Sequence, residues 1–401
     1  MPQGLKNYKM QIYYLFYEYL AEGLGGLSHV WEVVSRLNKT GYEVTVFAPR
    51  VGEFRPKNNL RIKYIPTLDI HLLRYVLFQF ISLFYLLFYS LIRKPDLIYN
   101  REMVLSPIPI VISKILQVPL ITEINGDLIE EWKNAGRSSL LIWLVGLIEK
   151  ITCKFSNFIV CVTEGLKNII SERYLISEDG FFVVPNGTNP GIMRSLDQKE
   201  CREKLGLPPE KRYVGFVGTF TSHQGLEHLV ECAKLIVGKY PELIFLIVGD
   251  GPMRKKLEEQ IQKRGLSSFF ILPGGVSQEK VVYYINSMDI CVAPFTRMRN
   301  ERIGLSSLKI YDYMACNKPI VASDIPGVGE LLREHNLGIP VPPDNTQELA
   351  NAIISILSSG EHISKYGQEG RRVILEKFDW EITAKKIKQI CDKALERRGG
   401  R

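Results

Sequence analysis

A turn rich in glycine follows the first apolar run of the chain. It reads Glu22-Gly23-Leu24-Gly25-Gly26-Leu27, and a segment of helical period comes next. Glycines between a strand and a helix let backbone N–H groups approach a ligand, and the helix N-terminus attracts phosphate. The spacing departs from the G-x-G-x-x-G dinucleotide fingerprint. The turn therefore indicates either a phosphate site at Gly25 and Gly26 or a plain tight turn.

Three loops in the second half also follow apolar runs and are rich in glycine or polar residues. They are Val217-Gly218-Thr219 with the nearby Gln224, Val248-Gly249-Asp250-Gly251-Pro252, and Pro273-Gly274-Gly275-Val276. If the runs are parallel strands of one sheet, the loops share the edge at which such sheets bind ligands.

A basic loop precedes a polar helix start. Arg297, Arg299 and Arg302 come before Ser306-Ser307-Leu308-Lys309, which opens a helical segment. A phosphate needs hydrogen-bond donors and positive charge, and arginine offers both in a bidentate arrangement. The loop is interpreted either as part of an anion site or as a solvated surface loop.

The first half has one comparable polar segment, Thr122-Glu123-Ile124-Asn125-Gly126-Asp127. Glu123 and Asp127 either orient a substrate or cap the next helix. His29, on the first helical segment, is expected to be a packed or surface residue rather than a ligand.

Composition narrows the class of protein. The net charge of +8 is scattered and too weak to indicate nucleic-acid binding, but it suits a phosphate-bearing substrate or an anionic membrane surface. The seven cysteines are widely spaced without a C-x-x-C pair, so neither a zinc site nor a disulfide framework is expected. This usage and the polar first ten residues predict a cytoplasmic protein without a signal peptide.

The elements that position these loops alternate between short apolar runs and longer helical patterns. This alternation predicts an α/β fold with two doubly wound, Rossmann-like domains, facing each other across a cleft where ligands bind. We expect one domain over residues 1–190, a second over 191–378, and a final helix over 379–401 that packs back on the first domain. The predicted strands are Met10–Leu15, Glu43–Phe47, Arg61–Ile65, Leu97–Tyr99, Leu120–Thr122, Phe158–Val162, Phe182–Val184, Tyr213–Val217, Ile244–Val248, Phe269–Leu272, Ile290–Ala293, Ile320–Ala322 and Gly338–Val341.

Two apolar helical segments allow more than one interpretation. Tyr75–Ile92 carries no charge over eighteen residues, which fits a buried crossover helix, a helix with an exposed face that touches a membrane, or a span. Gln79 and Ser82 give it one less apolar face. Leu140–Ile151 has basic flanks, which indicate either a membrane surface or a solvated helix end; the flanking residues are Lys133, Arg137, Lys150 and Lys154.

This ordered set of motifs resembles the glycosyltransferases of family 4, which have the GT-B fold. The likeness covers nearly the whole chain and is most specific from Lys309 to Ser323. The resemblance implies transfer from a nucleoside-diphosphate sugar with retention at the anomeric carbon and with no required metal or other cofactor. It further implies an acceptor held by the N-terminal half. For a surface-polysaccharide enzyme, this acceptor is a lipid-linked saccharide at the inner face of the cell membrane.

The resemblance also implies site residues, position by position. Gly25 and Gly26 match the glycines that face the donor phosphates, and Asp312 matches the carboxylate that binds the ribose hydroxyls. The diphosphate is expected to contact Gly218, Thr219, Gln224, Arg302, Ser306, Ser307 and Lys309, and the base is expected to lie beside Gly275 and Val276.

Three departures from the family pattern affect the expected chemistry. The first glutamate of an E-x7-E pair falls on Gly304, so Glu301 becomes the candidate for its role. Thr219 and Gln224 occupy the places of an arginine and a lysine, and Asn125 occupies the place of a histidine. We expect Arg297, Arg299, Arg302 and Lys309 to supply the missing charge. Asp127 or Glu123 is expected to orient the acceptor, and the predicted catalytic residues are Glu301, Asn125 and Asp127. The departures also keep two alternatives open, a sugar-nucleotide epimerase of GT-B fold and a non-catalytic transferase scaffold.

Overall fold

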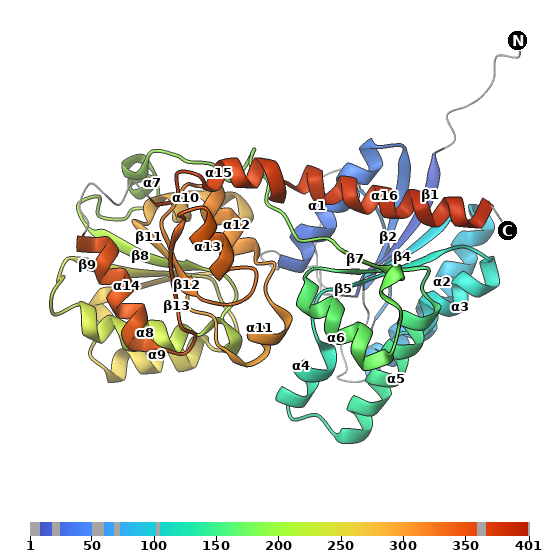
Figure 1. Ribbon diagram of the computed structural model, residues 1–401, viewed down its shortest axis with the longest axis horizontal. Coiled ribbons are helices and arrows are strands. Elements are labelled where there is room, and N and C mark those ends of the chain that lie inside the picture. Colours follow the sequence, from blue (N-terminus) through green and yellow to red (C-terminus); the bar gives the residue numbers. More distant parts are fainter. Residues whose placement is uncertain are drawn as a thin grey trace, which may run out of the picture. The chain divides into compact units, whose positions relative to one another are not determined.

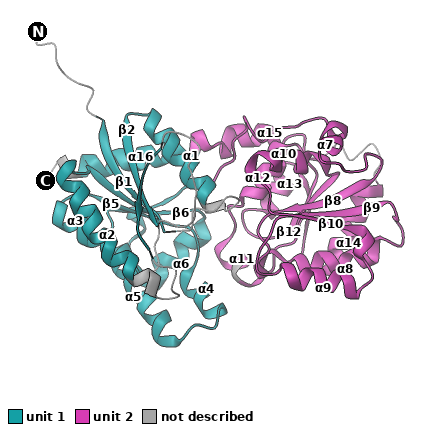
Figure 2. Cartoon of the chain, turned by 180° about the vertical axis from the view of Figure 1, so that it is seen from behind, with its two compact units in different colours: residues 1–185, 383–401 teal, residues 186–382 magenta. Residues whose placement is uncertain are grey.

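The computed structural model describes residues 9–17, 25–49, 60–67, 73–101, 105–358 and 366–399. The chain forms two compact units (Figure 2). Unit 1 comprises Met1–Pro185 with Thr383–Arg401, and unit 2 comprises Asn186–Ile382.

Unit 1 is built on a parallel sheet of seven strands in the order β3-β2-β1-β4-β5-β6-β7. The strands are β1 (Met10–Leu15), β2 (Tyr42–Pro49), β3 (Arg61–Ile65), β4 (Leu97–Arg101), β5 (Leu120–Ile124), β6 (Phe158–Cys161) and β7 (Phe181–Val183). The helices are α1 (Gly25–Lys39), α2 (Leu73–Ile92), α3 (Ile108–Leu116), α4 (Leu128–Asn134), α5 (Ser139–Phe155), α6 (Glu164–Tyr174), the short η1 (Glu178–Gly180) and α16 (Trp380–Gly399).

The strands of unit 1 bury both faces, as expected for a parallel sheet covered by crossover helices. Tyr13 and Leu15 belong to the core that α2 and α3 cover, where Phe78 also lies. Tyr14 points to the opposite face and stacks on Tyr99, with ring centroids 4.9 Å apart. This alternation follows from the two-residue period of a strand.

The last helix, α16, packs on unit 1 (Figure 1). The Tyr42 hydroxyl in β2 donates a hydrogen bond to Asp392, and Lys388 pairs with the same carboxylate at 2.7 Å. The Arg397 guanidinium lies 4.5 Å from the centroid of the Phe158 ring. The C-terminal segment therefore contributes to the structure of the first unit.

Unit 2 contains a parallel sheet of six strands in the order β10-β9-β8-β11-β12-β13. The strands are β8 (Arg212–Val217), β9 (Leu243–Val248), β10 (Phe270–Gly274), β11 (Ile290–Ala293), β12 (Ile320–Ser323) and β13 (Gly338–Val341). The helices are α7 (Gln198–Lys204), η2 (Ser222–Gln224), α8 (Leu226–Ile236), α9 (Arg254–Lys263), η3 (Ser267–Phe269), α10 (Gln278–Ser287), α11 (Met298–Ile303), α12 (Leu308–Ala315), α13 (Gly329–Glu334), α14 (Thr346–Ser358), α15 (Gly370–Val373) and η5 (Ile374–Phe378).

Two cores cover the faces of the second sheet. One contains Cys291 and Ala293 together with α10, α12 and α13, and the other contains Ile290 and Val292 together with α8, α9 and α14. Neighbouring residues of β11 thus enter different cores, which explains why the strand reads as a continuous apolar run. All seven cysteines are buried and free.

The two parallel sheets confirm the predicted α/β fold of two doubly wound units, and each predicted strand corresponds to a strand of the structure with small shifts at the ends. The π-helical turn η5 ends at Phe378, directly before α16. There Thr188 pairs with Asp379, and a Cβ on Gly187 would lie 2.8 Å from the Phe378 carbonyl oxygen. The close approach of these two backbones requires glycine at position 187.

Candidate functional site

The loops after β8, β9 and β10 lie in a row at the carboxyl edge of the second sheet. The Gly218 N–H donates to the Val248 carbonyl at 3.0 Å, and the Gly249 N–H donates to the Gly274 carbonyl at 2.9 Å. A Cβ on Gly249 would lie 1.9 Å from the Gly218 carbonyl oxygen, so only glycine allows this packing. Gly275 follows directly, and a Cβ added there would lie 3.8 Å from the Asp250 Cβ.

Lys309 reaches this row of loops from the first turn of α12. Its ammonium group donates a hydrogen bond to the Gln224 side-chain oxygen and lies 3.7 Å from the centroid of the Phe216 ring. A Cβ on Gly218 would stand 2.9 Å from the Lys309 Nζ. The structure therefore brings together Gly218, Gln224 and Lys309, three of the residues expected to contact the diphosphate.

The environment of Lys309 disfavours its charge. Burial lowers the pKa of Lys309 well below its usual range, although the residue as a whole keeps partial exposure. Among the described residues, no carboxylate lies within ion-pair distance of the ammonium group. An anionic ligand at this edge would supply the opposite charge that the described residues do not place beside the ammonium group.

The start of α12 is tied to the segment that opens unit 2. The Asn186 backbone N–H donates to Ser306 Oγ at 2.7 Å, and its side-chain amide donates to the Ser306 carbonyl at 2.9 Å. The Thr188 hydroxyl donates to Asp312 Oδ1 at 2.6 Å. Ser307 is the N-cap residue of α12 and makes no side-chain capping bond. The opening segment thus holds Ser306 and Asp312, two further predicted donor residues, in place.

The basic segment predicted to be a loop forms the short helix α11, with Arg297 at its N-cap, and it is more exposed than this cluster. Arg297 pairs with Glu301 at 3.3 Å, and about half of the Glu301 side chain is exposed. Arg302 is exposed as well, and the side chain of Arg299 lies outside the described residues. The Asn300 amide donates to the His223 carbonyl at 3.1 Å, which anchors α11 beside the Gln224 turn.

Thr219 and Val276 complete the predicted donor set. Both are partly exposed and lie in the loops that follow β8 and β10. The first predicted phosphate turn has a counterpart in unit 1, where α1 begins at Gly25 with Gly26 in its first turn. The preceding residues of that turn, Glu22 to Leu24, lie outside the described residues.

Unit 1 has a pocket of about 220 Å³ at the carboxyl ends of its strands. Asn125 lines it, as does Arg101 from the end of β4. The remaining lining residues are Phe16, Tyr17, Gly126, Leu128 and Glu131. The pocket combines aromatic, cationic and amide groups, which are suited to a polar ligand with hydroxyl or anionic substituents.

A buried carboxylate fixes one wall of this pocket. Glu123 is 1% exposed and accepts a hydrogen bond from the Tyr99 hydroxyl at 2.5 Å. His29 Nε2 lies 3.1 Å and Arg101 Nε 3.4 Å from its Oε1. Burial favours the neutral acid, but these neighbours outweigh it and lower the pKa of Glu123 to about 2. Glu123 therefore positions Arg101 at the pocket.

Asp127 has a structural role in this arrangement. It caps α4 by accepting the Glu130 N–H at 3.2 Å, and it pairs with Arg173 at 2.5 Å. The residue is 1% exposed, so the capping interpretation accounts for it. Of the three predicted catalytic residues, Asn125 reaches the pocket, Asp127 caps a helix, and Glu301 lies on the surface of unit 2.

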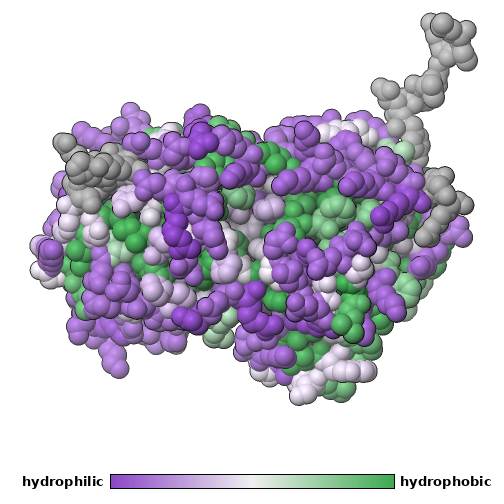
Figure 3. All heavy atoms as spheres, viewed as in Figure 1, coloured by the Kyte–Doolittle hydropathy of each residue, from purple (hydrophilic) through white to green (hydrophobic). Residues whose placement is uncertain are grey.

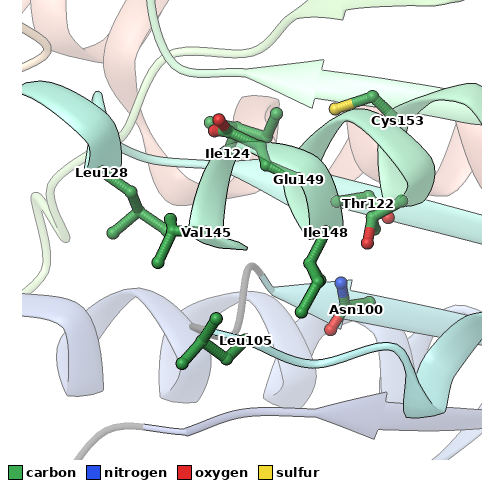
Figure 4. Close-up of a pocket in the computed structure, with 10 residues that line it drawn as sticks. Asn100, Leu105, Thr122, Ile124, Leu128, Val145, Ile148, Glu149 and Cys153 are labelled. Carbon is green, nitrogen blue, oxygen red and sulfur yellow. The ribbon is translucent and has the colours of Figure 1, made fainter. Parts of the chain in front are cut away.

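A second cavity lies between α5 and the strands β4 and β5, where Asn100, Glu149 and Cys153 face it (Figure 4). Its volume is about 10 Å³, which is room for about one water molecule. It reflects imperfect packing of α5 on the sheet and is too small for a substrate.

Several residues of these sites were not predicted from the sequence. Arg101 and Tyr17 line the pocket of unit 1, and His29 pairs with Glu123. Arg101 could have been predicted as a site residue, because it is a polar residue at the carboxyl end of a buried strand. Within the described parts of the chain, no group of three or more His, Cys, Asp or Glu side chains is placed to hold a metal ion.

Two family models match the chain. Residues 25–191 match Glycosyltransferase Family 4, and residues 197–373 match Glycosyl transferases group 1. An uncharacterised glycosyltransferase of Methanocaldococcus jannaschii is 24% identical over 97% of this chain and 100% of its own.

Solved structures share the fold. Sucrose-phosphate synthase from Thermosynechococcus elongatus superposes with a TM-score of 0.81 at 20% identity, over 97% of this chain and 100% of its own. HepE of Anabaena in complex with UDP-glucose superposes with a TM-score of 0.76 at 17% identity, over 96% of this chain and 100% of its own.

The fold and these matches define the class of protein: the chain is a glycosyltransferase of the GT-B fold. Within that class, its C-terminal half is similar to the group 1 glycosyltransferases and its N-terminal half to glycosyltransferase family 4. These matches do not favour the epimerase or the non-catalytic scaffold.

Proposed function

We propose that the protein transfers a sugar from a nucleoside-diphosphate sugar to a hydroxyl group of a lipid-linked saccharide, with retention at the anomeric carbon. The observation that carries the donor assignment is Lys309, whose buried ammonium group lacks a carboxylate partner among the described residues and lies at the carboxyl edge of the second sheet. A diphosphate there restores the charge balance. The structural likeness to HepE, a protein solved with UDP-glucose, supports the same class of donor.

The proposed chemistry assigns roles to both units. The bond between C1 of the sugar and the β-phosphate oxygen breaks, and C1 forms a bond to the acceptor oxygen on the same face. The acceptor proton passes to the leaving phosphate. Lys309 stabilises the charge that develops on that phosphate, and backbone N–H groups of the glycine loops add to this stabilisation. Because these groups supply the required charge, the reaction proceeds without a metal ion.

The ribose and the acceptor are placed by the remaining residues. Asp312, whose Oδ1 accepts a hydrogen bond from the Thr188 hydroxyl, accepts hydrogen bonds from the ribose hydroxyls. The pocket beside Arg101 and Asn125 holds the saccharide of the acceptor. A lipid-linked acceptor in surface-polysaccharide assembly places the enzyme at the inner face of the cell membrane. The exposed apolar side chains of unit 1 support this location.

A panel of UDP, GDP, ADP and their sugars tests the proposal. At a hundredfold excess over Kd, a bound ligand stabilises the protein by about 2.7 kcal/mol, which a thermal shift detects. We expect one nucleoside diphosphate and its sugars to raise Tm. When water replaces the missing acceptor, hydrolysis of that donor, followed by proton NMR, should release the sugar first in the anomeric configuration of the donor. Absence of a shift with every ligand, or release of the inverted anomer, contradicts the proposal.

A further inference from the structure

The outer surface of α2 is apolar, and its polar residues point inward. Phe80, Phe84 and Phe88 are between 56% and 62% exposed. Gln79 and Ser82 are instead buried, and Gln79 accepts a hydrogen bond from the Ser106 hydroxyl at 2.6 Å. A helix that faces water shows the opposite arrangement. The less apolar side that the sequence indicated is therefore the side that faces the core.

The same pattern continues on α5 and α3. Leu140, Trp143, Leu147 and Ile151 form an exposed stripe along α5 at helical spacing. Ile115 on α3 is also exposed, and Lys114 of α3 lies 5.1 Å from the centroid of the Phe155 ring on α5. We call these exposed apolar side chains of α2, α3 and α5 the apolar face.

Hydrophobic side chains reach the surface in the part of unit 1 where α3 and α5 are drawn (Figures 1 and 3). Both ribbon views place α2, α3 and α5 side by side (Figures 1 and 2). An exposed apolar surface built from three helices marks a site of interaction.

The charges around the apolar face select one kind of partner. Glu149 is the sole acidic residue of α2, α3 and α5, and it is buried with partners in Tyr174 and Arg173. The exposed charges of α3 and α5 are Lys114, Lys150 and Lys154. Cations beside exposed aromatic side chains complement an anionic bilayer surface, since the rings enter the interface and the lysines contact the headgroups.

No helix of the described chain is both long and apolar enough to cross a membrane. We infer that the apolar face docks the enzyme on an anionic bilayer, with the phenylalanines of α2 and Trp143 of α5 in the interface. This inference rests on the proposed function, because the proposed lipid-linked acceptor lies in the bilayer to which the apolar face would bind. The attachment itself is a property of unit 1 and can be measured without turnover.

Flotation with vesicles tests the docking. Wild-type protein should float with vesicles of phosphatidylcholine and phosphatidylglycerol at low salt and be partly released by high salt, because salt screens the lysines alone. The triple variant Phe80→Ser, Phe84→Ser, Phe88→Ser should lower the partition coefficient at least tenfold. Its matched control is Leu235→Ser with Leu375→Ser, exposed apolar residues of unit 2.

Charge variants give a second, independent arm. The variant Lys114→Glu, Lys150→Glu, Lys154→Glu should lose binding to anionic vesicles, by roughly fivefold or more for each lysine. Lys255→Glu with Lys263→Glu on α9 should bind as wild type. The emission of Trp143 should shift to the blue when vesicles are added, and Trp143→Phe should remove that shift.

Three results would overturn the docking. The first is wild-type protein that stays in the supernatant with anionic vesicles at low salt. The second is vesicle binding that both the phenylalanine and the lysine variants retain. The third is a dimer that these variants convert to monomers without loss of vesicle binding. Nucleotide binding is measured on the same samples. If it persists while docking fails, the docking surface is wrong and the proposed transferase function stands. If docking occurs without nucleotide binding, the proposed donor is wrong.

Discussion

The ammonium group of Lys309 lies 3.7 Å from the centroid of the Phe216 ring, close to the position that a side chain on Gly218 would occupy. The aromatic ring gives the cation a weak electrostatic partner without a formal negative charge. The lysine is therefore held in position while its charge is left to be balanced by a ligand.

This arrangement predicts that diphosphate binding takes up a proton. Above the lowered pKa of Lys309 the amine is neutral, whereas a bound diphosphate favours the ammonium form. The affinity of the protein for the diphosphate should therefore fall as pH rises above that lowered pKa. Calorimetry in two buffers of different ionisation enthalpy measures the uptake. Lys309→Arg should bind without it, because a guanidinium stays protonated. Undiminished uptake in Lys309→Met would assign the proton to another group.

Gly218→Ala tests the packing around the lysine. Gly218 has a φ of +149°, and the new Cβ would lie 2.9 Å from the Lys309 Nζ. We expect a loss of about 1–3 kcal/mol in stability from the backbone strain, with weaker diphosphate binding because the lysine is displaced. Gly238→Ala, which has open space around it, is the control. If Gly218→Ala binds as wild type, the lysine does not need its observed position.

Glu123 should govern the acid stability of unit 1. Its pKa is lowered from 4.5 to about 2, so its contribution is present above the ordinary value and is lost as pH falls through that interval. Glu123→Gln should lower the free energy of unfolding by about 3 kcal/mol at neutral pH. It should also flatten the fall of that free energy between pH 4.5 and about pH 2. Urea denaturation across this pH range measures both effects. Glu130→Gln, on the partly exposed first turn of α4, should retain the decline; if Glu123→Gln retains it too, the acid sensitivity has another source.

Donor turnover should continue after chelation. The proposed charge stabilisation comes from Lys309 and backbone N–H groups, so EDTA should leave the rate of donor cleavage unchanged. Loss of activity that Mn²⁺ restores would show that a metal holds the diphosphate instead.

The strands were predictable because buried parallel strands read as continuous apolar runs. The hydrogen bond between Lys309 and Gln224 was not predictable, since the two residues are 85 positions apart and come from different elements. The orientation of α2 was also hidden, because a less apolar side such as that of Gln79 and Ser82 ordinarily faces water, whereas here it is buried. Asp127 could be interpreted as a cap or as a substrate ligand until its contacts with Glu130 and Arg173 were known.

We propose that the edge of unit 2 around Lys309 holds the diphosphate of the donor. Calorimetric titration of wild type and Lys309→Met, with the preferred nucleoside diphosphate and with its nucleoside, separates binding of the phosphates from binding of the nucleoside. A charge-assisted hydrogen bond contributes about 1.5–3 kcal/mol, so the variant should bind the diphosphate roughly 10- to 150-fold more weakly. It should bind the nucleoside as wild type does. Equal affinity of both proteins for the diphosphate, or an equal loss for both ligands, would contradict the claim.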